Sequence, residues 1–133
     1  GGWENCAMRK SNMAAYLNQL TSAWQNAIKQ VNKLSSAGSQ STTIKTTADK
    51  LFLLSEVEIF GSTSYSVSGE GTQYAYYKAG NSKVKNVSGS AYSWWERSPF
   101  ASYTTYFCFV GSSGSANYNG ASYSFGVAFG FCV

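Results

Sequence analysis

Glu56 and Glu58 are the residues whose types and spacing come closest to catalytic chemistry. Two carboxylates perform general acid and base catalysis when both reach the same substrate. Ser55 and Glu58, however, have the spacing of a capping box, which predicts that both glutamates lie in the first turn of a short helix. Side chains two residues apart on a helix do not face each other. We therefore expect capping and an ion pair here, not catalysis.

The three cysteines, Cys6, Cys108 and Cys132, are the other reactive groups. An odd number argues against a disulfide framework, and without a histidine or a CxxC pair a zinc site is not expected. Cys108 and Cys132 lie inside apolar runs, which favours two buried thiols; a Cys108–Cys132 bridge between neighbouring strands is the alternative. The sequence also lacks a histidine-activated nucleophile and a phosphate loop, so we expect no enzyme and no cofactor.

The composition points to one domain over residues 1–133 with an unusually neutral surface. Aromatic residues make up 17% of the chain, charged residues 12%, and the net charge is +4. The lysines and arginines form no basic run, so a nucleic-acid partner is not expected. No apolar stretch reaches the length of about 20 residues that a membrane span needs, so we expect no membrane insertion.

The segment Trp94–Pro99 (WWERSP) is the densest structural signal in the chain. Two adjacent tryptophans usually anchor a core, and Pro99 prevents a central strand from continuing. Within this segment Arg97 has two interpretations. It forms a buried structural ion pair with Glu56 or Glu58, or it contacts a ligand.

Upstream of this segment, hydrophobic periodicity predicts mixed α and β elements. An apolar stripe predicts two short helices that meet near Leu20, with Thr21 or Ser22 as the cap of the second. The stripe consists of Met13, Leu17, Leu20, Trp24, Ile28 and Val31. The other predicted elements are a surface loop over Ser35–Thr47, a buried strand over Lys50–Leu54, a loop over Gly61–Gly71, an unassigned helix or strand around Tyr74–Tyr77 and an edge strand over Lys83–Val87.

The tail from Ser98 to Val133 contains no Asp, Glu, Lys or Arg, where an average stretch would carry roughly nine. Aromatic residues alternate there with Ser, Thr, Gly, Asn and Ala, which is the composition of antibody paratopes. The alternative is a β meander whose aromatics are core, and part of the tail has that period-2 pattern. The aromatics among turn-forming residues are expected to be exposed and to mark an interaction site; they are Phe100, Tyr103, Tyr118, Tyr123 and Phe125.

The same region has a regularity at the level of codons. Between Phe100 and Phe125 there is no Lys, Glu, Gln, Met or Trp, the residues that an Asn codon cannot become when only its two adenines change. The positions that fit such a change, and that we predict to bind a ligand, are Phe100, Tyr103, Thr105, Tyr106, Phe109, Gly111, Ser113, Ser115, Asn117, Tyr118, Asn119, Gly120, Tyr123 and Phe125.

Five segments of the chain resemble a domain family of bacteria and their phages, whose genes often resemble the variable proteins of diversity-generating retroelements. These segments are Gly2–Arg9 (GWENCAMR), Asp49–Gly61 (DKLFLLSEVEIFG), Glu70–Tyr77 (EGTQYAYY), Trp94–Pro99 (WWERSP) and Gly126–Val133 (GVAFGFCV). In those systems a reverse transcriptase with adenine-specific errors rewrites a C-terminal repeat.

This resemblance implies an α+β, C-type-lectin-like fold, the class that includes the formylglycine-generating enzymes, with two short N-terminal helices and irregular antiparallel strands. It implies that residues 100–125 are a variable ligand-binding region held by Trp94–Pro99 and Gly126–Val133. The resemblance also implies extra strands upstream of Gly1, so this chain is expected to start inside the domain. The signatures of calcium-dependent lectins are absent.

From the tail and the resemblance together we expect a diversified ligand- or receptor-binding domain on a phage tail tip or a bacterial surface. Its partner would be a protein or another cell-surface ligand, and a homo-oligomer could form through the scaffold face. The alternative function is an adhesin or carbohydrate-binding module of fixed specificity.

Overall fold

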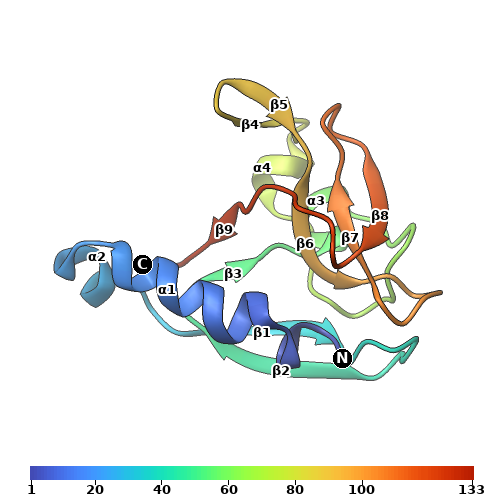
Figure 1. Ribbon diagram of the computed structural model, residues 1–133, viewed down its shortest axis with the longest axis horizontal. Helices are drawn as coiled ribbons and strands as arrows, with labels where there is room; N and C mark the ends of the chain where they lie inside the picture. The colour runs from blue at the N-terminus through green and yellow to red at the C-terminus, as the bar shows by residue number, and fades with distance from the viewer.

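The computed structural model describes all 133 residues as a mixed α and β fold with four small antiparallel sheets (Figure 1). A 3-10 turn η1 (Trp3–Asn5) and a π-helical turn η2 (Met8–Asn12) lead into the helices, which are α1 (Met13–Gln19), α2 (Ser22–Ala27), α3 (Glu56–Phe60) and α4 (Ala75–Lys78). The strands are β1 (Val31–Ser36), β2 (Ile44–Asp49), β3 (Phe52–Leu53), β4 (Lys85–Val87), β5 (Ser90–Tyr92), β6 (Trp94–Pro99), β7 (Tyr106–Val110), β8 (Ala116–Gly120) and β9 (Phe129–Gly130).

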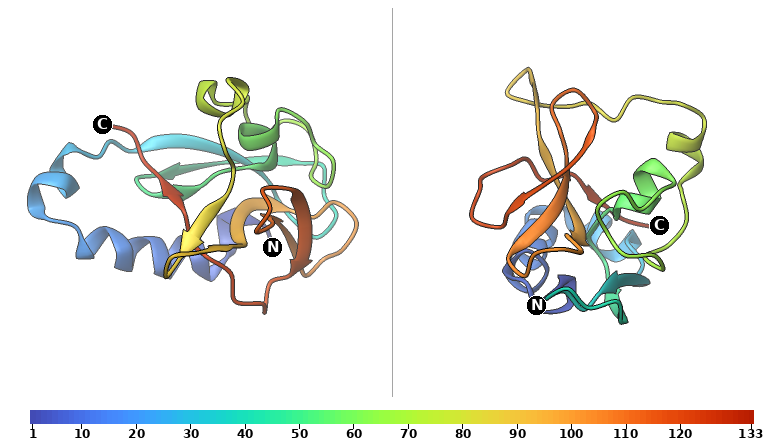
Figure 2. Two further views of the ribbon diagram at one scale, coloured as in Figure 1. Left: turned by 90° about the horizontal axis from the view of Figure 1, so that it is seen from above. Right: turned by 90° about the vertical axis from the view of Figure 1, so that its right-hand side faces the viewer.

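The two predicted N-terminal helices are confirmed. The chain turns between α1 and α2, and the Thr21 hydroxyl accepts a hydrogen bond from the backbone N–H of Trp24 at 3.4 Å, as an N-cap residue does. The helical stripe ends earlier than predicted, because Val31 already belongs to β1. Figure 2 shows the C-terminal residues returning to the end of the molecule that carries α2, where Trp24 meets Phe131 edge-to-face.

The predicted loop over Ser35–Thr47 is correct only for residues 37–43, which connect the two strands of a hairpin. Strands β1 and β2 pair in antiparallel register, from Val31 opposite Asp49 to Ser36 opposite Ile44. The buried side of β1 is polar, because Lys33, Ser35 and Ser36 face inward. A hydrophobic pattern cannot reveal a strand whose inner side chains are polar, and here the Lys33 ammonium pairs with Glu58 while the Ser36 backbone N–H bonds to Glu70.

The predicted buried strand over Lys50–Leu54 is confirmed in a shorter form. Strand β3 pairs with β9 close to the C-terminus, Phe52 opposite Gly130. The predicted capping box is also present at the start of α3: the Ser55 hydroxyl accepts from the Glu58 N–H, and the Glu58 carboxylate accepts from the Ser55 N–H. Gly61 ends α3 in the left-handed region, at φ 73°.

Two further predicted segments contain a helix and a strand. The unassigned segment around Tyr74–Tyr77 is the helix α4, and the predicted edge strand contains β4, which pairs only with β5. None of the helices combines the length and the apolar character needed to cross a bilayer.

The three-stranded sheet β6–β7–β8 organises the second half of the chain. A register shift lies between Trp95 and Pro99, and every residue of β6 is buried. Trp94 packs with Ile59, Tyr77 and Val110 in one core cluster, whereas Trp95 packs in another with Trp3, Leu53 and Phe109. The prediction that the two tryptophans anchor the core is therefore confirmed, and each anchors a separate cluster.

Candidate binding surface

Arg97 on β6 is fully buried, and each of its five N–H donors has an acceptor. Two hydrogen bonds, of 2.6 and 3.0 Å, reach the Glu58 carboxylate. The others reach the backbone carbonyls of Leu34, Leu53 and Glu70. The predicted structural ion pair is therefore confirmed with Glu58. Because all five N–H donors of Arg97 bond within the chain, none is left for a ligand.

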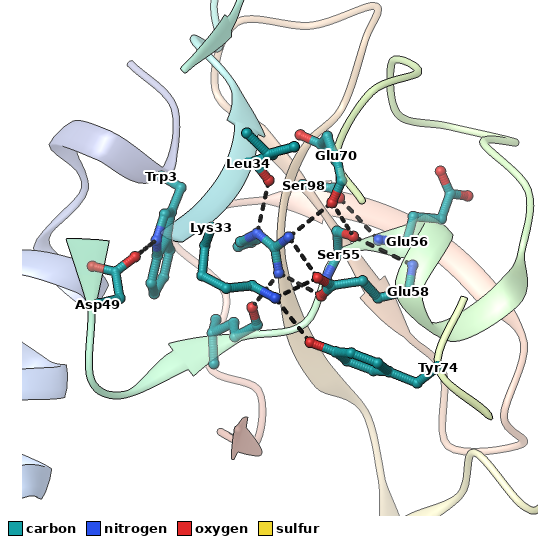
Figure 3. Close-up of polar contacts among 12 residues, drawn as sticks. Trp3, Lys33, Leu34, Asp49, Ser55, Glu56, Glu58, Glu70, Tyr74 and Ser98 are labelled. Atoms are coloured by element: carbon teal, nitrogen blue, oxygen red, sulfur yellow. Dashed lines mark hydrogen bonds and ion pairs between the residues drawn. The ribbon is translucent and has the colours of Figure 1, made fainter. Parts of the chain in front are cut away.

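Lys33 and Tyr74 complete the polar cluster around Glu58. The Lys33 ammonium lies 2.5 Å from a Glu58 oxygen and 2.8 Å from the Tyr74 hydroxyl, and Figure 3 shows the three side chains converging. Burial lowers the pKa of Lys33. Burial alone would raise the pKa of Glu58, but the hydrogen bonds and charges of Arg97 and Lys33 outweigh it and hold the pKa below its usual range. Glu58 is thus a buried anion between two cations.

Glu56 and Glu70 attach neighbouring segments to this cluster. The Glu56 carboxylate accepts from the backbone N–H groups of Tyr65 and Ser66 and from the Ser66 hydroxyl, which fixes the loop after α3. The Glu70 carboxylate accepts from the Ser36 N–H at 2.7 Å and from the Ser98 hydroxyl. Glu56 and Glu58 therefore bind different partners, as the helical spacing predicts, and share no substrate cleft.

Glu96 differs from the other buried acids because neither of its carboxyl oxygens has a hydrogen-bond partner. Burial raises the pKa of Glu96 well above its usual range, and the nearby carboxylates of Glu56 and Glu70 raise it further. Burial therefore favours the protonated, uncharged form of this carboxyl. It is the one acid of WWERSP, and it makes no ion pair.

One side of β7 and β8 carries a cluster of stacked aromatic rings, which we call the aromatic platform. The rings of Phe100 and Tyr118 stack with centroids 3.9 Å apart and planes 7° apart, and Tyr103 lies 5.1 Å from Tyr106. Tyr103 is 56% exposed, whereas Phe100 beneath it is only 8% exposed. The platform consists of Tyr65, Phe100, Tyr103, Tyr106 and Tyr118.

The predicted exposure of the tail aromatics is correct only in part. Tyr103 and Tyr123 are exposed, Tyr118 and Phe125 are half-buried, and Phe100 is buried, contrary to the prediction. Phe100 is covered because it follows the last residue of β6, where its N–H bonds to the Tyr106 carbonyl and its ring is enclosed by neighbouring rings.

The other predicted ligand-binding positions also divide by exposure. Phe109 is buried opposite Trp95 in the core, and Gly111 is buried where an added Cβ would lie 3.0 Å from the Ser115 hydroxyl oxygen. Among the remaining predicted positions, the exposed ones are Thr105, Ser113, Ser115 and Asn117. The half-buried ones are Tyr106, Asn119 and Gly120. The structure gathers the predicted set around β7, β8 and their loops.

Strand geometry distributes this set over both faces of the sheet. Tyr118 is opposite Cys108 in the register, so its side chain lies on the same face as the Tyr106 side chain. Asn117 is opposite Phe109, and Asn119 is opposite Phe107, so these side chains lie on the other face. The accessible positions therefore surround the β7–β8 hairpin.

Two residues at this surface were missed by the sequence reasoning. Tyr65 comes from the loop after α3 and packs edge-to-face on Tyr118 at 4.9 Å. Gln40, in the β1–β2 turn, donates to the Ser102 carbonyl at 2.8 Å. Both lie in Ser- and Thr-rich segments with no periodicity, so the only available signal was the aromatic character of Tyr65.

The cysteines do not form the bridge considered as an alternative. All three thiols are free: Cys108 is buried, Cys6 is half-buried and Cys132 is exposed. Burial raises the pKa of Cys108. The expectation of two buried thiols therefore holds for Cys108 and is wrong for Cys132, which lies after β9 in an isolated β-bridge with Lys29. No group of acidic or cysteine side chains is arranged to hold a metal ion.

Comparison with known proteins identifies the family of the chain, whose function is unknown. The model of the family described as "Domain of unknown function (DUF6273)" matches residues 1–133. The chain belongs to this family. No curated protein and no solved structure matches the chain.

Proposed function

We propose that this DUF6273 domain is a ligand- or receptor-binding domain whose recognition surface is the aromatic platform and the neighbouring β7–β8 hairpin. One combination of observations carries the proposal. Tyr103 is exposed and packs on the buried ring of Phe100, and the chain that forms this surface has no charged residue from Ser98 onward. Exposed tyrosines offer a large contact area with few rotors to restrict, and Ser and Asn nearby provide adaptable hydrogen bonds.

The frame beneath the surface supports this function because it is independent of the exposed rings. Arg97, Glu58 and Lys33 hold β6 to α3 and β1 through buried ion pairs. The core clusters contain none of Tyr103, Thr105 or Asn117. A surface whose side chains contribute little to folding can change without loss of the fold, which is what a diversified binding protein requires.

We further propose that the accessible positions are diversified by a retroelement, on a C-type-lectin-like scaffold displayed on a phage tail tip or a bacterial surface. The codon regularity between Phe100 and Phe125 is its support. The burial of Phe100, Phe109 and Gly111 restricts the tolerated changes at those three positions. The neighbouring DNA tests the proposal. An Asn-rich repeat that differs from this gene only at adenines is expected, and purine-ending codons at the exposed positions would contradict it.

A display experiment tests the surface itself. A library would randomise five positions, and a control library would randomise five exposed residues on the helices and β2. Both would be selected against lysozyme and serum albumin as probes. The test positions are Tyr103, Thr105, Asn117, Tyr118 and Tyr123, and the control positions are Ser11, Ala15, Gln19, Lys45 and Thr46.

We expect binders from the first library only, with affinities that change little between low and high salt, because the surface is uncharged. Equal yields from the two libraries would contradict the proposal, as would the absence of binders from the first.

A fixed-specificity carbohydrate-binding module is the second candidate, and the exposed ring of Tyr103 favours it, since aromatic faces stack on sugar rings. A glycan array separates the two functions. Strong binding to one glycan class that is lost in Tyr103→Ala would favour the module over the diversified receptor.

A further inference from the structure

A cavity of about 280 Å³, partly open to solvent, lies between the N-terminal turns and the sheet. Trp95 of β6 and Phe107 of β7 contribute to its walls. Because successive side chains on a strand point to opposite faces, Phe107 lies on the face of β7 opposite to Tyr106 and the aromatic platform. The cavity therefore lies on the other face of the sheet from the aromatic platform.

The walls of the cavity are held in place by specific contacts. The indole N–H of Trp3 donates to the Asp49 carboxylate at 3.0 Å, and the same carboxylate accepts from Arg9 of η2 at 2.7 Å. One buried acid thus fixes both η1 and η2. On the other side, Trp95 packs edge-to-face on Phe109. Since protein interiors are close-packed, a recess of this size with fixed walls is a distinct feature of the fold.

The backbone at the rim of the cavity has an uncommon form. Residues Met8–Asn12 make a π-helical turn, which is rare and is found frequently at functional sites. Met8 and Asn12, at the two ends of this turn, both line the cavity. Asn12 is half-buried, and its side-chain amide can both donate and accept a hydrogen bond.

The lining defines the chemistry of the occupant. It contains two tryptophans, further apolar residues and no basic side chain, and burial raises the pKa of its one acid, Glu96. An anionic ligand would find no counter-ion there, and burial disfavours the charged form of Glu96 that a cation would need. An apolar cavity of about 150 Å³ accommodates benzene, so 280 Å³ provides room for roughly ten non-hydrogen atoms.

We propose that this cavity binds a neutral, planar aromatic molecule of the size of indole, which carries one hydrogen-bonding group that pairs with the Asn12 amide. The ligand would lie against Met8 and Phe107, the half-buried apolar residues of the lining, and would approach past Ala121, in the loop after β8, which lines the cavity and is itself exposed. This site does not depend on the proposed recognition function.

The probe is 5-fluoroindole, titrated into the full chain and followed by ¹⁹F NMR. We expect a dissociation constant of about 1 mM or tighter. Ala121→Phe, which fills the cavity, should weaken binding at least tenfold, and Ala7→Phe, at another wall, should do the same. Ala91→Phe on β5 is the matched control and should change the affinity by less than twofold, as should Tyr103→Ala on the platform. Thermal melting establishes that each variant is folded.

The role of Asn12 is tested by comparing indole with indene, which lacks the N–H group. Indole should bind the parent protein several-fold more tightly than indene, and this preference should disappear in Asn12→Leu. No binding of the probe up to its solubility limit would overturn the cavity proposal. Unchanged affinity in both folded cavity-filling variants would overturn it equally.

Discussion

The Arg97 guanidinium binds the Glu58 carboxylate through two buried hydrogen bonds and connects β6 to α3. Arg97→Ala leaves Glu58 buried with only Lys33 as a cationic partner. We expect a loss of about 3–5 kcal/mol in the free energy of unfolding, measured by urea denaturation. Arg9→Ala is the control, because the Arg9 side chain is partly exposed and its loss should cost less. Equal stabilities of the Arg97 variant and the parent would show that the buried pair is not structural.

The unpaired carboxyl of Glu96 predicts a specific dependence of stability on pH. Its pKa is raised in the folded protein and has its ordinary value, 4.5, when unfolded. The folded state therefore binds its proton more tightly, so the stability that this group contributes is complete below pH 4.5 and is lost as the pH rises toward the raised value. The loss is about 1.4 kcal/mol for each pH unit in that window.

Glu96→Gln removes the titration. We expect the melting temperature of the variant to exceed that of the parent at pH 8 and the difference to shrink toward pH 4. Glu4→Gln, outside the buried network, is the control. A constant difference between Glu96→Gln and the parent across this range would contradict the raised pKa.

Phe100 and Tyr103 contact each other in the platform but should respond differently to truncation. Phe100→Ala removes a buried ring that stacks on Tyr118, and we expect a loss of about 3 kcal/mol in the free energy of unfolding. Tyr103→Ala removes an exposed ring, and the expected loss is below about 1 kcal/mol. Urea denaturation of both variants measures the difference. A large loss for Tyr103→Ala would mean that the fold needs this ring and that the surface cannot vary freely.

The three thiols should differ in reactivity toward Ellman's reagent. Cys132 is exposed and should react first. Cys6 should react slowly because partial burial raises its pKa, and Cys108 should react only when the protein unfolds. Cys132→Ser should remove the fast phase, whereas Cys108→Ser should leave it unchanged. A fast phase that persists in Cys132→Ser would show that Cys6 or Cys108 reacts fast, which would contradict their burial.

The elements with strong local signals were predictable from the sequence. The Thr21 cap, the capping box of Ser55 and Glu58 and the buried Trp94–Pro99 strand depend on residues close together in the chain. The Arg97–Glu58 pair was predicted with Glu56 as an equal candidate, because only the fold decides which carboxylate faces β6. The β1–β2 hairpin was missed because its inner residues, such as Lys33 and Ser36, are polar and find their partners 25 and 34 residues away.

The amino-acid sequence by itself determined the uncharged, tyrosine-rich character of the tail, because composition is independent of folding. Only the tertiary structure decided which of those rings reach solvent. Phe100 and Tyr103 stand in similar local sequences, yet Phe100 is covered by Tyr118 from β8 while Tyr103 remains open. The cavity beside Trp3 and Trp95 likewise depends on segments almost a hundred residues apart. Burial is set by contacts between distant segments, and no local pattern records those contacts.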